Sequence, residues 1–413
     1  MKKIVILGAG FAGIRAALNA EKIFRGRAEV ILIDKNSYHL FTPALYEVAS
    51  AYGIKREPHA VTLRQTVAVP IKDIIDLTSI KFIQAEVRVV DLKEKKISIS
   101  GGEELPFDSL VIALGSQTSD FGVNGVAKYS IPFKTIGDAL RVYNQIEKLF
   151  RDAGDGKLVL PIKIFVIGAG FTGIELASEI ANCARKLSHD FGLNKKAYQI
   201  SLFEQAPKIL PMVSDEEREV VVKRLTELGI IIMANSQIEE INGQSLRMKD
   251  GHVLHGSAII WTAGVMPNTF LKSISDLPLT EKGKVKVDQY LRVLGFDSIY
   301  AAGDIIDFID PITQKQIPAM AFNAIEQAKL IVKNIYLSSQ ERKLKPYQPK
   351  PGSWIAPIGG KWALAHTGLL DLKGLPGWVI REIVDFRYLN SILSFNKAAT
   401  LFRNEIKFFT RND

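Results

Sequence analysis

Two glycine-rich stretches with the same spacing contain the residues of this chain best suited to bind a cofactor. Residues 8–14 read Gly-Ala-Gly-Phe-Ala-Gly-Ile, and residues 168–174 repeat six of these seven residues at an offset of 160. Each stretch follows a short apolar run and opens a helical pattern. Glycines at this spacing let the backbone turn tightly and approach a pyrophosphate at the positive end of the helix. One such stretch is a weak signal, but two in the same context predict two bound nucleotides.

An acidic residue follows the second strand that we expect in each unit. The expected strand 29–33 leads to Asp34, and the expected strand 199–203 leads to Glu204. A carboxylate in this position accepts hydrogen bonds from the ribose hydroxyls of a dinucleotide. Glu204 would also repel a 2′-phosphate and so favours NAD over NADP, but the nearby Lys208 leaves this preference open.

Several further strands end in small residues, which leave room for a cofactor to approach the backbone. These ends lie at residues 113–116, 261–264 and 300–304, the last of which delivers Gly303 and Asp304. Residues 38–48 mix aromatic and polar side chains around a proline, so they suit neither a plain strand nor a plain helix. Two interpretations stay open for this segment: it lines a planar ring, or its aromatic side chains belong to the core. We expect a structural role for His39.

Composition limits the class of protein. At 413 residues, with 47% hydrophobic residues, the chain is long enough for two or three domains. It has no apolar run of about 18 residues or more, and its first strand begins directly after the N-terminal Met-Lys-Lys. We therefore expect no membrane span, no signal peptide and folding in the cytoplasm. The net charge of +9 suits an anionic membrane or an acidic protein partner, and no nucleic-acid-binding motif accompanies it.

The composition changes after the proline-rich stretch 345–352, which we interpret as a domain boundary. Apolar residues then recur at helical spacing, with basic residues between them. The apolar set is Val379, Ile383, Phe386, Leu389, Leu393, Ala398, Phe402, Ile406 and Phe409, and the basic set is Arg381, Arg387, Lys397, Arg403, Lys407 and Arg411. This pattern predicts amphipathic helices in a membrane interface, although the core face of an ordinary helix gives the same pattern.

Taken together, these motifs resemble the flavoproteins with two dinucleotide-binding domains, and within them the type II NADH:quinone oxidoreductases, which are single-subunit and do not pump protons. The resemblance covers residues 1–340 well and residues 345–413 in pattern only. It implies an α/β fold of two Rossmann-like domains, with an NADH domain at 119–284 inserted into an FAD domain formed by 1–118 and 285–344. Residues 345–413 would form an amphipathic helical membrane-binding region.

The resemblance also implies site residues. Non-covalently bound FAD would contact Gly8, Gly10, Phe11, Ala12, Gly13, Asp34, Lys35, Thr42, Pro43, Val87, Ala113, Gly115, Gly303 and Asp304. NADH would contact Gly168, Gly170, Phe171, Thr172, Gly173, Glu204 and Gly264, and Glu175 would be the catalytic residue near the point of hydride transfer. A helix-end interaction with the backbone dipole is the structural alternative for Glu175. No metal ligands are expected.

The expected quinone side departs from the family. The helix after Gly303 and Asp304 usually carries two glutamines, which Phe322 and Glu326 replace here. These two residues and Tyr46 are our candidates for the quinone side, and the native acceptor stays open.

The resemblance predicts a peripheral enzyme on the cytoplasmic face of the cell membrane that oxidises NADH through FAD and reduces a membrane quinone. Its partners would be NADH, quinone and an anionic membrane surface; whether it forms a homodimer stays open. The single cysteine, Cys183, cannot supply the cysteine pair of a sulfide:quinone oxidoreductase or a disulfide reductase. A soluble NAD(P)H-dependent ferredoxin or rubredoxin reductase and a non-catalytic NADH-sensing flavoprotein remain as alternatives.

Overall fold

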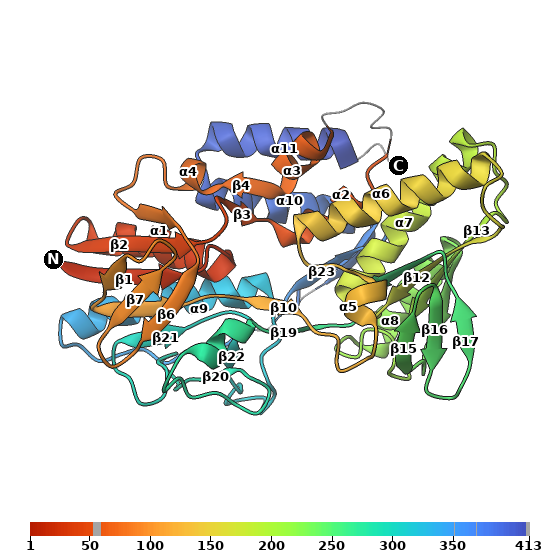
Figure 1. Cartoon of the computed structure of the whole chain (residues 1–413). Helices are drawn as coiled ribbons and strands as arrows, with labels where there is room; N and C mark the ends of the chain where they lie inside the picture. Colours follow the sequence, from red (N-terminus) through yellow and green to blue (C-terminus); the bar gives the residue numbers. More distant parts are fainter. Residues whose placement is uncertain (53–58, 351, 369, 410–413) are drawn as a thin grey trace.

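Two parallel sheets form the centres of two lobes that lie side by side (Figure 1). The computed structural model describes residues 1–52, 59–350, 352–368 and 370–409. The first sheet has the order β21 (Ile299–Ala301), β9 (Ser109–Ile112), β1 (Lys2–Leu7), β2 (Ala28–Asp34) and β5 (Lys81–Gln84). The second has the order β11 (Ile131–Pro132), β18 (Ala258–Trp261), β12 (Ile162–Ile167), β13 (Tyr198–Phe203) and β14 (Ile230–Met233).

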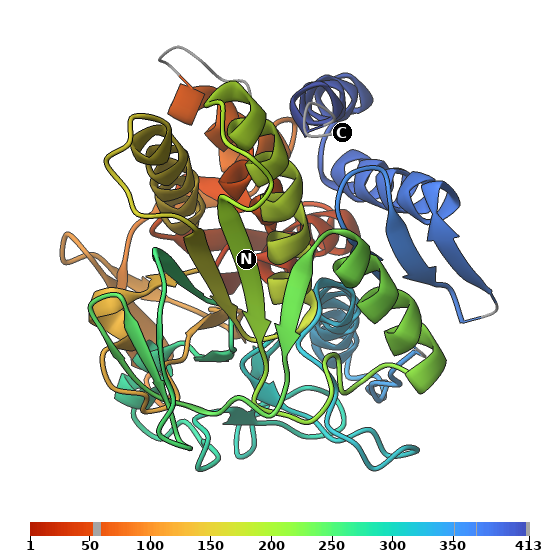
Figure 2. The ribbon, with the colours of Figure 1, turned by 90° about the vertical axis from the view of Figure 1, so that its right-hand side faces the viewer.

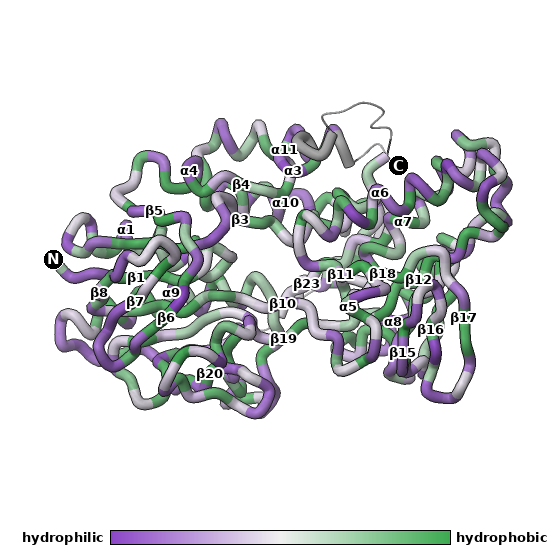
Figure 3. The backbone as a smooth tube through the Cα atoms, in the orientation of Figure 1, coloured by the Kyte–Doolittle hydropathy of each residue, from purple (hydrophilic) through white to green (hydrophobic). Residues whose placement is uncertain are grey.

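The central strands form because most of their residues are apolar. Residues 4–7 of β1 and 164–167 of β12 are buried, as expected for parallel strands that are covered on both faces. Figure 3 shows both strands as largely hydrophobic. The strand β21 pairs with β9 of the first sheet only after the whole second sheet has been completed. The second sheet is therefore nested within the first, while the domain boundaries near residues 118, 284 and 344 stay predictions.

Helices cover both sheets. In the first lobe, α1 (Phe11–Phe24) packs against α9 (Ala321–Ser339). The second lobe has α6 (Ile136–Gly154), α7 (Phe171–Asp190) and α8 (Asp215–Glu227). Both α1 and α7 begin directly after a glycine loop, as the sequence predicts.

Smaller elements connect these layers. The segment 38–48 forms β3 (Tyr38–Leu40), η1 (Thr42–Ala44) and part of α2 (Leu45–Ala49), which confirms that it is neither one strand nor one helix. The antiparallel pair β10 (Ser116–Thr118) and β19 (Val265–Pro267) joins the two lobes. The others are α3 (His59–Val67), β4 (Ala68–Pro70), α4 (Ile71–Ile74), β6 (Val87–Asp91), β7 (Lys96–Ile99), β8 (Glu104–Pro106), α5 (Val126–Tyr129), β15 (Ile238–Asn242), β16 (Ser245–Met248), β17 (Val253–His255), η2 (Thr269–Ser273), β20 (Val285–Lys286) and β22 (Ile306–Asp307).

The C-terminal region contains the predicted helices, α10 (Leu375–Ile392) and α11 (Phe395–Phe409), but a sheet precedes them. Strands β23 (Trp354–Pro357), β24 (Ala363–His366) and β25 (Asp371–Gly374) form an antiparallel sheet that the sequence analysis did not predict. Each strand has four residues, too few to show a clear alternation of apolar and polar side chains. In Figure 2 these blue strands lie beside the green helix α8.

The helix α10 exposes part of its apolar set and buries polar residues of its other face. Arg381, Asp385 and Leu389 are buried, whereas Val379 and Ile383 are exposed. The expectation that Arg381 lies at a membrane surface was therefore wrong, because buried carboxylates surround its guanidinium group. Figure 3 shows hydrophilic and hydrophobic segments mixed along this helix. Arg411, another member of the predicted basic set, lies outside the described residues.

Within the described part of the chain, none of the helices has the length and apolar character needed to cross a bilayer.

Candidate active site

The two glycine loops have the same geometry. Gly8 and Gly168 adopt φ values of +97° and +106°, which favour glycine. A Cβ atom on Gly13 would lie 1.7 Å from the carbonyl oxygen of Gly8, and one on Gly173 would lie 1.8 Å from that of Gly168. In both units, only glycine allows the helix to pack this closely on the loop.

The helix ends that follow these loops are open. Gly10 and Gly170 are the N-cap residues of α1 and α7, and neither helix end has a side-chain cap. A Cβ atom on either glycine would meet no atom within 4 Å. No side chain therefore caps either helix start, and the space beside each N-cap glycine is free, as a pyrophosphate site requires.

The two predicted ribose carboxylates also have equivalent places. Asp34 accepts a hydrogen bond from the backbone N–H of Ala9 at 2.7 Å, and Glu204 accepts one from Ala169 at 2.9 Å. Each carboxylate is thereby held against its glycine loop.

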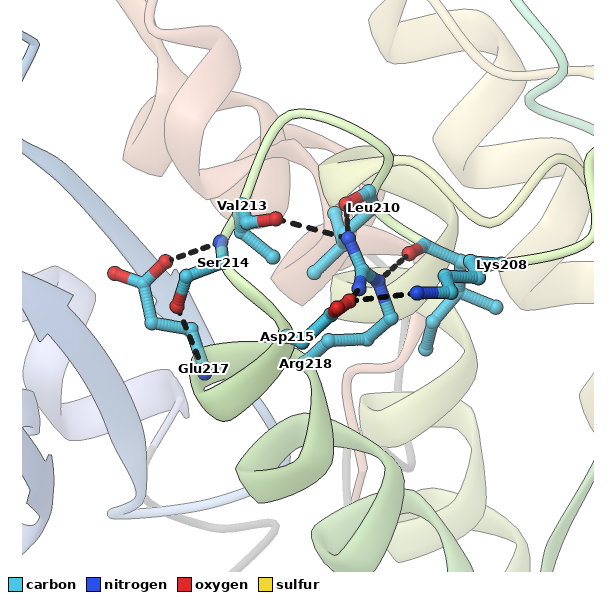
Figure 4. A network of polar contacts seen from close by, with 8 residues as sticks. Lys208, Leu210, Val213, Ser214, Asp215, Glu217 and Arg218 are labelled. Atoms are coloured by element: carbon cyan, nitrogen blue, oxygen red, sulfur yellow. Dashed lines mark hydrogen bonds and ion pairs between the residues drawn. The ribbon is translucent and has the colours of Figure 1, made fainter.

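The nearby Lys208 forms an ion pair with Asp215 at 2.9 Å (Figure 4), so the charge of Lys208 already has an acidic partner.

Asp304 lies in a polar network between the lobes. Ser116 donates a hydrogen bond to the Asp304 carboxylate at 2.5 Å, and Lys134 donates one to the Ser116 hydroxyl at 2.9 Å. Gln327 on α9 accepts from the backbone N–H of Gly303 at 2.8 Å. Ser116, Lys134 and Gln327 were not among the predicted contact residues, because only the tertiary structure, with β10 paired to β19 and α9 beside Gly303, brings them to the site.

The other predicted contact residues lie on the surrounding elements. The Ala113 carbonyl oxygen would lie 2.4 Å from a Cβ atom on Gly8, whereas Gly115 has open space where a side chain would lie. A Cβ atom on Gly264 would meet the ring of Phe121 at 2.7 Å. Thr42 and Pro43 form η1, Lys35 directly follows β2 and Val87 begins β6. Ala12 and Phe11 begin α1, and Phe171 and Thr172 begin α7.

His39 links the first glycine loop to the C-terminal helix. Its Nδ1 lies 2.9 Å from the Ala9 carbonyl oxygen and its Nε2 lies 2.7 Å from the Tyr388 hydroxyl. Since a carbonyl can only accept, Nδ1–H donates and Nε2 accepts from Tyr388. Burial lowers the pKa of His39 to about 4, so the ring stays neutral. Tyr388 also stacks on Phe41, with ring centroids 5.5 Å apart. These contacts agree with the structural role expected for His39.

A buried cluster of carboxylates surrounds Arg381. The guanidinium lies 2.6 Å from Glu47 of α2, 2.9 Å from Glu382 and 3.0 Å from Asp385. The Tyr46 hydroxyl donates to Glu47 at 3.0 Å. One cation therefore faces three carboxylates at a buried junction of α2 and α10, and such an excess of negative charge favours protonation.

Glu175 lies close enough to this cluster to share its electrostatics. It lies near the N-terminal end of α7 and is partly buried. Desolvation raises its pKa to about 8, with Arg381 opposing and Asp385 and Glu47 adding to the shift. Burial likewise raises the pKa of Glu47 to about 8 and that of Asp385 to about 6, in both cases against the effect of Arg381. The structure thus brings Glu175 and Tyr46 to one region rich in exchangeable protons.

The other two quinone-side candidates lie on α9. Phe322 is exposed. Glu326 pairs with Lys329 and Lys350, each at 2.6 Å. Burial of Glu326 raises its pKa, but these two lysines outweigh that effect and hold it below the usual value. Their part in quinone binding stays a prediction.

Comparison with known proteins identifies the family. A family model described as pyridine nucleotide-disulphide oxidoreductase matches residues 2–328. The chain belongs to this family. The type II NADH:quinone oxidoreductase of Staphylococcus aureus is 30% identical over 413 residues, covering 96% of this chain and 98% of its own length. That of Staphylococcus saprophyticus is 27% identical, covering 94% of both chains. The chain is thus a member of the type II NADH:quinone oxidoreductases, which confirms the resemblance seen in the motifs.

Solved structures show the same fold in other oxidoreductases. NDH2 from Plasmodium falciparum in complex with NADH matches with a TM-score of 0.87, 20% identity and 99% coverage of both chains. The sulfide:quinone oxidoreductase of Aquifex aeolicus matches with a TM-score of 0.79, 18% identity, and coverage of 96% of this chain and 92% of that one.

The disulphide chemistry in the family's name is not open to this type II enzyme acting alone. Its single cysteine cannot form an intramolecular disulfide. Cys183 is buried in α7, and burial raises its thiol pKa to about 12, which opposes formation of a reactive thiolate. This agrees with the expectation of an inert, buried cysteine.

We expect Gly10→Ala and Gly170→Ala to separate the two nucleotide sites. Both variants should fold, because the added methyl group meets no neighbouring atom. Gly10→Ala should lose bound flavin, since the methyl group would occupy the space left for the pyrophosphate. Gly170→Ala should keep flavin but have a raised KM for NADH. Flavin absorbance per chain and steady-state kinetics measure the two effects, and full flavin content in Gly10→Ala would contradict this assignment.

We also expect the carboxylate cluster to make stability depend on pH. Because the pKa of Glu47 is raised from 4.5 to about 8, the folded state holds a proton that the unfolded state has released in this range. The free energy of unfolding should therefore fall as pH rises from 4.5 to 8, by up to about 1.4 kcal/mol per pH unit for each proton held. Denaturant titrations should give a weaker dependence for Glu47→Gln. Glu104→Gln, on an exposed side chain, is the control and should match the wild type.

Proposed function

We propose that this protein oxidises NADH through non-covalently bound FAD and reduces a membrane quinone without pumping protons. The observation that carries the proposal is the pair of equivalent glycine loops, each with an open helix end and a carboxylate held against it. Relatives that match over nearly the whole chain, named as type II NADH:quinone oxidoreductases, support it.

The first loop is the proposed site of FAD and the second that of NADH. Three features fit FAD: the uncapped helix start at Gly10, the carboxylate of Asp34 and the hydrogen-bond network around Asp304. When bound, FAD supplies a ring that accepts a hydride and passes on two electrons. The chain itself would place the two nucleotides and hold the protons that move with these electrons. The pairing of Lys208 with Asp215 supports NADH over NADPH, because this lysine is then less available to a 2′-phosphate.

Glu175 is the proposed catalytic residue. Its place near the N-terminal end of α7, which follows the second glycine loop, puts it beside the expected NADH site. Reduction of a quinone to a quinol consumes two protons together with two electrons. The raised pKa values of Glu175 and Glu47 mean that both carboxyl groups are largely protonated at pH 7. This region can therefore hold protons where they are needed, with Tyr46 hydrogen-bonded to the same cluster.

The exposed apolar residues of the C-terminal helices form the proposed membrane contact. They are Leu375, Val379, Ile383, Val384 and Phe395. Contiguous apolar residues on a helix surface, together with basic residues and a net charge of +9, suit the interface of an anionic bilayer. This arrangement would place the enzyme peripherally on the cytoplasmic face of the membrane, where Phe322 and Glu326 are the candidates for the quinone side.

We expect anaerobic NADH to bleach the flavin absorbance and a water-soluble quinone to restore it. Glu175→Gln should keep its flavin, while turnover falls by about tenfold or more because a carboxyl proton is lost. Glu147→Gln on α6 is the control and should keep wild-type turnover. Reduction of a ferredoxin but of no quinone would favour a soluble reductase, and absence of any turnover would favour a sensor.

The membrane contact can be tested without disturbing the core. Deletion of residues 378–413 would also remove the buried Leu389, so point variants are preferable. The double variant Val379→Ser, Ile383→Ser should keep flavin but bind vesicles with anionic lipid more weakly in a sedimentation assay. Val159→Ser, which changes an exposed residue between α6 and β12, should bind like the wild type. Equal vesicle binding by the wild type and both variants would rule out this surface as the membrane contact.

A further inference from the structure

A second cluster of ligand-type side chains lies where α8 meets the C-terminal sheet. Glu217 is in the first turn of α8, while His366 ends β24 and Asp371 begins β25. The Nδ1 atom of His366 lies 2.9 Å from Glu217 Oε1 and 2.8 Å from Asp371 Oδ1. The three atoms all lie within 4.8 Å of one another. The cluster thus joins the second lobe to the C-terminal hairpin.

Hydrogen bonds alone do not satisfy every polar atom of this cluster. A ring nitrogen carries at most one proton, so Nδ1 can make one good hydrogen bond, and Asp371 receives it. Glu217 Oε1 has no hydrogen-bond partner among the described residues, although the Glu217 side chain is only 9% exposed. A buried carboxylate oxygen without a partner is costly. A shared cation would satisfy both carboxylates and the ring nitrogen together.

We propose that Glu217, His366 and Asp371 bind a divalent zinc ion. One imidazole and two carboxylates suit zinc, whereas calcium and magnesium prefer oxygen ligands alone. Tetrahedral zinc with bonds of about 2.0–2.2 Å holds its ligand atoms about 3.3–3.5 Å apart. The nitrogen–oxygen distances of 2.8 and 2.9 Å therefore need only a small widening. The side chains of His366 and Asp371 are 33% and 49% exposed, which leaves a path for the ion and a place for a water ligand.

The surroundings already hold the ligands in place. The backbone N–H of Ser214 donates to the other oxygen of Glu217 at 2.8 Å, and the Ser214 hydroxyl accepts from the backbone N–H of Glu217 (Figure 4). The ring of His366 stacks on Trp354 with centroids 5.8 Å apart and an angle of 13° between the planes. Contacts that fix ligand orientation in this way are typical of metal sites.

The proposed ion would strengthen an existing junction. Arg224 of α8 donates to the carbonyl oxygens of Ile358 and Gly359 at 3.1 and 3.0 Å, and Gly360 donates to Glu179 of α7 at 2.7 Å. Zinc would add a link at the other end of the same sheet, which continues into α10. It would therefore stabilise the fold without taking part in electron transfer.

The test uses the full-length, flavin-loaded enzyme after treatment with EDTA and removal of the chelator. Isothermal titration with zinc chloride should give about one site per chain, and zinc should raise the melting temperature because it binds only the folded state. His366→Gln and Asp371→Asn should each lose this binding and the thermal shift while keeping wild-type flavin absorbance and circular dichroism. His252→Gln is the matched control, because His252 lies 3.1 Å from Asp250 in an exposed pair, and it should bind zinc like the wild type.

Any one of three results would overturn the proposal: no zinc binding by the wild type, unchanged zinc binding by His366→Gln or Asp371→Asn, or loss of zinc binding by His252→Gln. Binding of magnesium or calcium in place of zinc would also overturn it. Since none of these readouts uses turnover, failure here is distinct from failure of the proposed NADH:quinone activity.

Discussion

The close approach of backbone to backbone at the two glycine loops is the constraint on which the rest of the structure depends. Gly13 lies against the carbonyl of Gly8, and Gly173 lies against that of Gly168, so closely that no side chain fits between them. This approach sets the direction of α1 and α7 and leaves their N–H groups open. Asp34 and Glu204 then close each loop from the second strand. The two lobes are therefore two versions of one local arrangement.

The C-terminal region contributes to the site rather than only to the surface. Tyr388 reaches His39 beside the first loop, and Arg381 pairs with Glu47 of α2. A buried ion pair with surplus carboxylates is a poor source of stability, because desolvation offsets much of the attraction. Burial raises the pKa values of the Glu47 and Asp385 carboxyl groups, and these groups in turn raise the pKa of Glu175. The helix that presents Val379 and Ile383 outward thus also shapes the electrostatics inside the enzyme.

The same fold serves different chemistry in its relatives. The solved structures that match this chain include a sulfide:quinone oxidoreductase, and the family takes its name from disulphide chemistry. In this chain a single inert cysteine is combined with two complete nucleotide loops. The difference lies in side chains placed on a shared scaffold, as is usual when one fold has several activities.

The sequence by itself determined the two nucleotide units, their nesting and the family, because each rests on a local pattern of glycines, apolar strands and a following carboxylate. It also predicted the C-terminal helices, which have a clear helical spacing. Only the tertiary structure decided which face of α10 is buried, because Arg381 is held inward by Glu47, more than 300 residues earlier in the chain, and Asp385 pairs with Arg381. The same holds for Ser116, Lys134 and Gln327, and for the meeting of Glu217 with His366. Contacts between residues so far apart leave no periodic signal, and they form only when the lobes and the C-terminal sheet pack together.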